Sequence, residues 1–165
     1  MNLAIVCGRI CSIPKSTVIM IDGAQCFVCK FTIALENGEY CTSGKMVDKS
    51  YDFLETITFG SPAEHISKHF SNGSKIVTYG TLKNYKFNDA NGTAHYTNIL
   101  VINHVEFGDS QSAITNVLTK KSNADVTIKA DLKHMEDMFK RACEDGFFCI
   151  DENDYYRIAT GRMEI

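Results

Sequence analysis

The chain has 165 residues, 44% of them hydrophobic and 22% charged, and a net charge of −3. This is the composition of a globular protein with a core large enough to need no disulfides. It shows no signal peptide and no apolar run near the ~20 residues of a membrane span, so we expect a cytoplasmic protein with no membrane partner. Bulk charge does not indicate a nucleic-acid binder, so any anion site must be a local patch.

The seven cysteines are an odd number, which excludes a complete disulfide framework and fits a reducing compartment. Cys26 and Cys29 form a C-x-x-C motif, which elsewhere binds zinc or carries out redox chemistry. Here the motif lies inside a strand pattern, where residues three apart point to opposite faces. We expect both to be buried small hydrophobic residues. We expect no metal and no other cofactor, because His65 and His69 also lack a matching carboxylate.

Three strands are predicted in the first third of the chain. Residues 2–14 form a near-continuous apolar run in which Gly8 indicates a bend or bulge. Residues 25–36 alternate apolar and polar side chains, and residues 51–59 do the same. The polar segment between them, residues 36–50, reads as a long loop.

A short helix and two longer strands follow. Residues 61–64 read Ser-Pro-Ala-Glu, which supplies an N-cap, a proline in the first turn and a capping-box glutamate. Asn72 and Gly73 end the helix. Residues 74–88 and 94–107 are the two strands, joined by a "DANG" turn. Five strands with a helix between the third and fourth form an OB-fold barrel, a mainly β fold that binds oligonucleotides or oligosaccharides. The last hairpin is long enough to extend beyond the barrel.

After residue 107 the composition changes. Residues 111–124 are rich in Ser, Asn and Thr and are predicted to link an OB-fold domain, residues 1–110, to a small α+β unit, residues 125–165. Within that unit, an apolar stripe at helical spacing ends at Gly146. The remaining elements are a further strand at residues 125–129 and a short hairpin around residues 151–154.

The fourth strand carries an unusual face. Lys83, Tyr85 and Phe87 alternate on the side opposite to Leu82, which belongs to the core-facing parity. Exposed rings beside a lysine suit an unpaired nucleic-acid strand, because bases stack on rings and the ammonium group neutralises phosphate. Lys86, on the other face of the hairpin, is placed to reach a second path of that strand. The alternative for Tyr85 and Phe87 is a surface that binds another protein.

Four further residues are candidates for the same interface. Phe53 and Phe59 lie at the two ends of the third strand on one parity, although Phe59 also fits the core and Phe53 fits the core or an oligomer interface. Tyr40 lies in the long loop. Arg9 follows Gly8 in the first strand and could contact phosphate or stack on a base. We find no P-loop, no nucleophile elbow and no paired carboxylates, so we do not expect an enzyme.

The first 108 residues resemble a bacterial-type single-stranded DNA-binding protein. The resemblance is carried by "MNLAIVCGRI", "FVCKFTIAL", "YDFLETITFG" and, most specifically, "FSNGSKIVTYGTLKNYKFNDANGTAHYTNILVINHVEF". It implies an OB-fold subunit that assembles, usually as a homotetramer with a dimer as the alternative, and wraps single-stranded DNA. It also implies a cytoplasmic, nucleoid-associated role in replication, recombination or repair, with stacking at Phe53, Phe59, Phe87 and Tyr40.

The chain departs from this family in two respects. It has no tryptophan, which members often use for stacking, so the rings are Phe and Tyr. It also lacks the low-complexity tail and acidic tip that recruit partner enzymes. We expect residues 125–165 to dock replication or repair proteins or to self-associate, with a stabilising cap on the barrel as the alternative. The alternative function is an OB-fold interaction accessory of a replication or recombination complex with weak DNA affinity.

Overall fold

The computed structural model describes residues 1–37, 50–88, 91–108, 123–144 and 152–160, and it gives no side-chain detail for 123–131 and 152–153. In chain order its elements are β1 (Ala4–Ile10), β2 (Lys15–Ile21), β3 (Ala24–Asn37), β4 (Ser50–Phe59), α1 (Ser61–His69), β5 (Lys75–Asn88), β6 (Ala94–Phe107), α3 (Asn123–Glu144) and α4 (Glu152–Thr160). The fold of the described residues is mainly β, as predicted.

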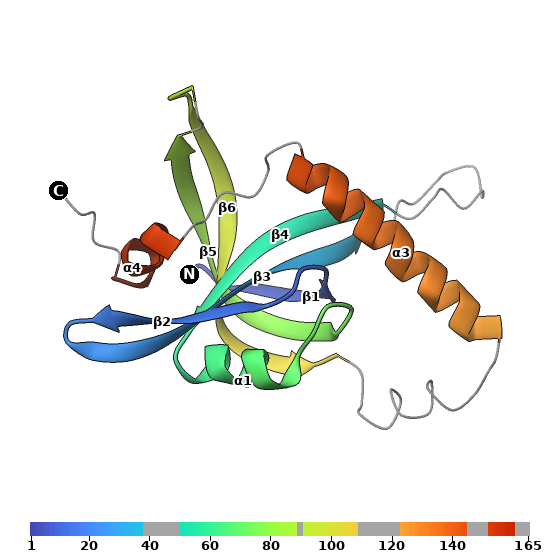
Figure 1. Cartoon of the computed structure of the whole chain (residues 1–165), viewed down its shortest axis with the longest axis horizontal. Coiled ribbons are helices and arrows are strands. Elements are labelled where there is room, and N and C mark those ends of the chain that lie inside the picture. The colour runs from blue at the N-terminus through green and yellow to red at the C-terminus, as the bar shows by residue number, and fades with distance from the viewer. Residues whose placement is uncertain (38–49, 89–90, 109–122, 145–151, 161–165) are drawn as a thin grey trace.

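The strands close into a barrel. The pairings run β1–β5–β6–β4–β3, and β3 pairs again with β1. All neighbours are antiparallel except β4 and β6, which are parallel. This arrangement, with α1 between β4 and β5, is the predicted OB-fold. Figure 1 shows the outer halves of β5 and β6 projecting from the barrel. We call this projecting hairpin, residues 84–88 paired with residues 94–98, the arm.

A strand that was not predicted follows the predicted first strand, residues 2–14. β1 ends at Ile10, and β2 begins at Lys15 and forms a hairpin with β3, so the described chain has six strands where five were expected. The turn of this hairpin is Asp22-Gly23, with positive φ angles of 48° and 83°. Asp-Gly between two apolar runs is a strong hairpin signal, and it is visible in the sequence.

Helix α1 closes one end of the barrel interior. Its buried side chains, Ala63 and Ile66, pack with the strands' inward-facing side chains and with Phe70, whose ring stacks on Phe107 at a centroid distance of 4.3 Å. The predicted capping box is wrong, because the N-cap is Gly60 and no side chain caps the helix. The largest buried interior residues are Ile10, Phe31, Ile33, Ile66, Ile76 and Leu100.

Two glycines mark special points of the barrel, a close approach of two strands at Gly8 and a register shift at Gly80. The register of β1 is continuous through Gly8, so the predicted bulge is absent there. A Cβ at Gly8 would instead lie 2.5 Å from the Ala34 carbonyl oxygen, where β1 meets β3. The register shift occurs between Tyr79 and Gly80, at the point where β5 leaves the barrel. Bulges increase local twist, so this one helps to set the direction of the arm.

The C-terminal segment is helical where strands were predicted. Residues 125–129 lie inside α3, and α4 replaces the hairpin predicted around residues 151–154. Short apolar runs do not distinguish strands from helices, and the helical spacing of Tyr155 and Ile158 gives α4 a face that packs on the barrel. Most of the predicted linker, residues 111–124, lies outside the described residues.

Candidate nucleic-acid interface

The register collects the predicted aromatic residues on one side of the sheet. Phe31 and Ile33 of β3 and Leu100 of β6 point into the barrel, so residues of the other parity point away from it. We call the side of β3, β4, β6 and β5 that points away from the barrel interior the outer face. It carries Val28, Lys30, Ala34, Phe53, Glu55, Ile57, Phe59, Lys83, Tyr85, Phe87, Ile99 and Val101. Five of the eight predicted site residues therefore share one surface.

Helix α4 covers the part of the outer face next to the arm. Its Tyr155 and Ile158 form a buried cluster with Tyr85, and Phe59 and Phe87 pack at its border, partly buried. Tyr85 keeps only 6% of its surface exposed. Lys83, Tyr85 and Phe87 do share one face, as predicted, but the expectation that Tyr85 is exposed is wrong because α4 lies on it.

Polar groups of α4 also contact this part of the outer face. The Lys83 ammonium group donates a hydrogen bond of 3.2 Å to the Ile158 carbonyl oxygen. Lysine at the C-terminal end of a helix complements the unpaired carbonyls and the helix dipole there. The Arg157 guanidinium lies 4.8 Å from the centre of the Tyr85 ring, and it also bonds Asp154 within the helix at 3.1 Å.

Helix α3 covers the opposite end of the outer face. The Phe53 and Phe139 rings lie 5.5 Å apart in a tilted arrangement, and Met135 is buried against Ala34 and Cys11. Asn72 donates a hydrogen bond of 3.2 Å to the Glu136 carboxylate. Phe53 is thus neither a free stacking platform nor part of the barrel interior in this structure.

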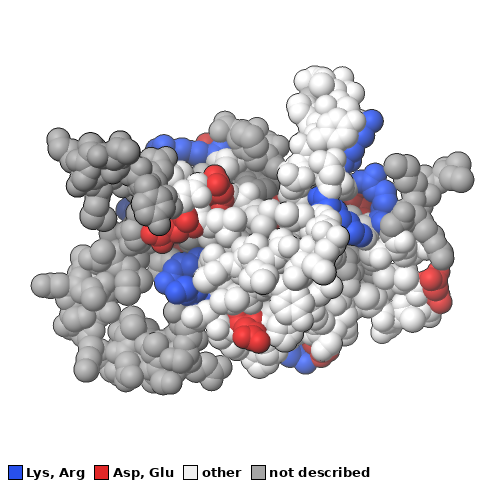
Figure 2. All heavy atoms as spheres, turned by 180° about the vertical axis from the view of Figure 1, so that it is seen from behind, with Lys and Arg blue, Asp and Glu red and all other residues white. Residues whose placement is uncertain are grey.

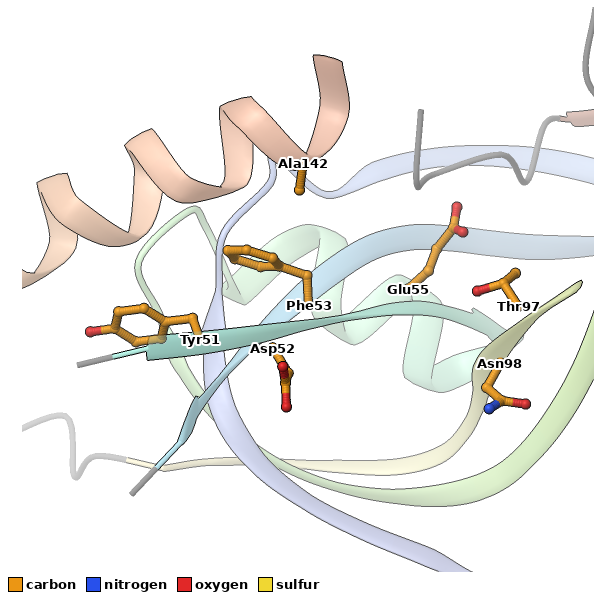
Figure 3. A pocket seen from close by; sticks show the side chains of 7 residues that line it. All are labelled: Tyr51, Asp52, Phe53, Glu55, Thr97, Asn98 and Ala142. Carbon is orange, nitrogen blue, oxygen red and sulfur yellow. The ribbon is translucent and has the colours of Figure 1, made fainter. Parts of the chain in front are cut away.

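A cavity of about 300 Å³ is lined by residues of α3, β4 and β6. Figure 3 shows Phe53 pointing from β4 toward α3, whereas Asp52 points to the other side of the strand. The lining residues are Tyr51, Asp52, Phe53, Glu55, Thr97, Asn98 and Ala142. The cover over the Phe53 end of the outer face is therefore incomplete.

A buried ion pair lies between the two covered ends. Lys30 and Glu55 approach to 2.7 Å, and Glu55 is only 3% exposed. Burying a carboxylate is costly unless a cation compensates it, so this pair fixes Lys30 toward Glu55. Lys30 is therefore already engaged within the outer face.

The reverse side of the arm is open. Lys86 lies 5.8 Å from the centre of the Tyr96 ring, and Tyr96 is 65% exposed. Lys86 was predicted to lie on the other face from Tyr85, and it does. Sequence reasoning did not select Tyr96 or His95, whose ring stacks on Phe87 at 5.3 Å. In a hairpin, loop length fixes the register, here Phe87↔His95 and Lys86↔Tyr96. The sequence therefore contained a signal that these two residues lie beside the predicted ones.

The remaining predicted residues lie elsewhere. Arg9 pairs with Ala34 in the strand register and donates a hydrogen bond of 3.1 Å to the Gly73 carbonyl oxygen. It thereby ties β1 to the turn after α1. Tyr40 lies outside the described residues, so its predicted role stays a prediction.

Charge is dispersed on the side of the molecule shown in Figure 2. Most of its described surface is uncharged, and Lys and Arg side chains occur at separate positions, several of them along and beside the arm. Among the described residues, no group of three or more potential metal ligands is present. None of the helices in that part of the chain is long and apolar enough to cross a membrane.

The C-x-x-C cysteines differ in burial. Cys29 is fully buried in the barrel interior, as predicted, whereas Cys26 is half-buried. Burial raises the pKa of the Cys29 thiol to about 11, and burial likewise raises the pKa of Cys11, beneath α3, to about 12. Both therefore remain neutral thiols near neutral pH, which suits packing rather than nucleophilic chemistry.

Two kinds of similarity connect this fold with known proteins. The model of the single-strand binding protein family matches residues 1–108. The chain is 27% identical to a single-stranded DNA-binding protein of Fusobacterium nucleatum over 113 residues, which cover 68% of this chain and 70% of that one. It is 24% identical to a protein of the same name from Clostridium perfringens over 110 residues, 67% of each chain. The family match spans the complete barrel and the arm, so the chain belongs to the single-strand binding protein family.

Proposed function

We propose that this chain binds single-stranded DNA without catalysis or sequence preference, and protects it during replication, recombination or repair. The observation that carries the proposal is the gathering of Phe53, Phe59, Tyr85 and Phe87 on one outer face together with Lys83. Every base offers a π-face, so stacking on these rings tolerates any sequence. Family membership and the names of the two relatives support the same function.

The test compares unpaired and paired DNA. Fluorescence anisotropy with labelled oligo-dT and with a duplex of equal length should show much tighter binding of oligo-dT. Affinity should fall as salt rises, because each neutralised phosphate releases counterions. Equal affinity for the two DNAs would contradict the proposal.

We also propose that the chain forms a homo-oligomer, with a tetramer as the expected state. The support is an exposed apolar set at β1 and β5, where Ile5 and Tyr79 are direct partners in the register and Leu3, just before β1, has the same parity as Ile5. Single exposed apolar residues are ordinary, but a contiguous set indicates an interaction surface. Light scattering of the wild type and of Ile5→Lys tests this. A monomer mass for the wild type would contradict the oligomer, and equal oligomer masses for the two proteins would contradict this surface.

A second function is favoured by a separate observation. Helices α3 and α4 cover Phe53 and Tyr85, and the surface in Figure 2 has no continuous basic region among its described residues. These features fit an OB-fold accessory that binds a replication or repair protein and DNA only weakly. In that case the preference for oligo-dT over duplex would be small, and Phe87→Ala would leave DNA affinity unchanged.

A further inference from the structure

We propose that α4 and single-stranded DNA occupy the same part of the outer face in alternation, so that α4 must leave before Tyr85 can stack on a base. This inference rests on the proposed function. It concerns α4 rather than α3, because α4 contacts both Tyr85 and Lys83.

The apolar contacts exclude simultaneous occupancy. Tyr85, Tyr155 and Ile158 are each at least nine-tenths buried in one cluster. A base needs an open ring face to stack on, and Tyr85 offers almost none while α4 is docked. Phe59 and Phe87 border the same cluster, so a strand lying across all three rings would meet α4.

The polar contacts of α4 are of the kinds that DNA would make. The Lys83 ammonium group, suited to a phosphate oxygen, instead donates to the Ile158 carbonyl oxygen. The Arg157 guanidinium is a planar group, and it lies over the Tyr85 ring, where a base would stack. Helix and DNA therefore compete for the same donor and the same ring as well as for space.

The helix is suited to leaving. It has nine residues, and isolated helices of fewer than ~12 residues are marginal in water, so α4 depends on its contacts with the barrel. The barrel itself closes through strands that all precede α4 in the chain. Undocking of α4 therefore leaves the barrel's own pairing intact. By linkage, DNA binding must weaken α4 docking by the same factor as docking weakens DNA binding.

A matched pair of full-chain variants tests the proposal. Ile158→Gln removes a buried contact of α4, and Ala159→Gln places the same side chain at a half-buried neighbour outside the cluster. Glutamine is neutral and forms helices well, so neither variant adds charge that would repel phosphate. In oligo-dT anisotropy we expect Ile158→Gln to bind about tenfold or more tightly than wild type, from the loss of one buried aliphatic contact. Ala159→Gln should bind as wild type does.

Hydrogen exchange of the wild-type chain gives a second, variant-free test. Amides of Glu152–Thr160 should lose protection when saturating oligo-dT is added, while those of β3 and β4 keep theirs. If oligo-dT binds to wild type and both variants alike and α4 protection is unchanged, the alternation is wrong and the proposed function stands. If oligo-dT binds to none of the three, the proposed function fails and this inference with it. A thermal melt of Ile158→Gln like that of wild type confirms that the barrel is intact.

Discussion

The two sides of the barrel wall are both covered, but by different means. The interior is apolar and is closed by α1, which lies between β4 and β5 in the chain. The outer face mixes rings with the Lys30–Glu55 pair and Lys83, and it is covered by α3 and α4, which follow the completed barrel. The interior packs within the strands and α1, whereas the cover on the outer face comes from helices that take no part in the strand pairing. On the proposed function, the interior holds the fold and the outer face carries the DNA-binding surface.

The largest expected effect is in the interior. Phe31→Ala should cost about 3–5 kcal/mol of unfolding free energy, because it leaves a cavity in close-packed surroundings. Phe31 is 1% exposed, whereas Phe27, four residues earlier on the same side of β3, is 43% exposed. Phe27→Ala is therefore the matched control and should cost less than about 1 kcal/mol. Urea unfolding measures both. Equal losses of unfolding free energy would contradict the expectation that the buried ring contributes more to stability than the exposed one.

The next effect is on the outer face itself. Lys30→Met should cost about 3 kcal/mol, because it leaves the Glu55 carboxylate buried without its cation. The double variant Lys30→Met/Glu55→Leu should recover most of that loss, since it removes both charges. Chemical denaturation of the three proteins checks this. A double variant no more stable than Lys30→Met would show that the pair is not the source of the effect.

The third effect separates the two faces of the arm. Phe87→Ala should weaken oligo-dT binding by roughly 1–3 kcal/mol, the usual contribution of one stacked ring. Tyr96→Ala, on the reverse side of the arm, should weaken it much less. Anisotropy titrations at one salt concentration compare them. If Tyr96→Ala weakened binding more than Phe87→Ala, the DNA-binding surface would lie on the Lys86 side of the arm.

The smallest effect depends on pH. The unfolded Cys29 thiol ionises from about pH 9, whereas burial holds the folded thiol neutral to a pKa of about 11. The folded state therefore binds the extra proton in this window, and stability should fall by up to roughly 1.4 kcal/mol per pH unit between pH 9 and 11. Denaturation at pH 8 and pH 10 should show a shallower fall for Cys29→Ala than for wild type. An equally steep fall in wild type and Cys29→Ala would contradict the assignment of this loss to Cys29.

The barrel could be predicted from the sequence because its signals are local and agree with one another. Strand alternation, the Asn-Gly turn of the arm and the proline at the start of α1 all point to the same element order. The β2 strand, Lys15–Ile21, was missed because no element was assigned to residues 15–24, although Asp22-Gly23 marked the hairpin. Strand parity also grouped Lys83, Tyr85 and Phe87 on one strand and Phe53 and Phe59 on another, and the observed register places the two groups on one side of the sheet.

The cover on that face could not be predicted in the same way. Whether Tyr85 is exposed depends on a helix about 70 residues later in the chain, and no local pattern links the two. The alternation around Tyr155 also fitted a strand, and only its packing on Val28 and Ile57 distinguishes the helix. A long-range contact of this kind must come from the tertiary structure.

The order of elements along the chain has a consequence for synthesis. All barrel strands lie before Gly108, and both covering helices lie after residue 122. During translation, N-terminal domains fold first, at chain growth rates of about 5–20 residues per second. All residues of the barrel are therefore synthesised a few seconds before those of α4. We expect the strands to begin pairing while the rings of the outer face are still uncovered.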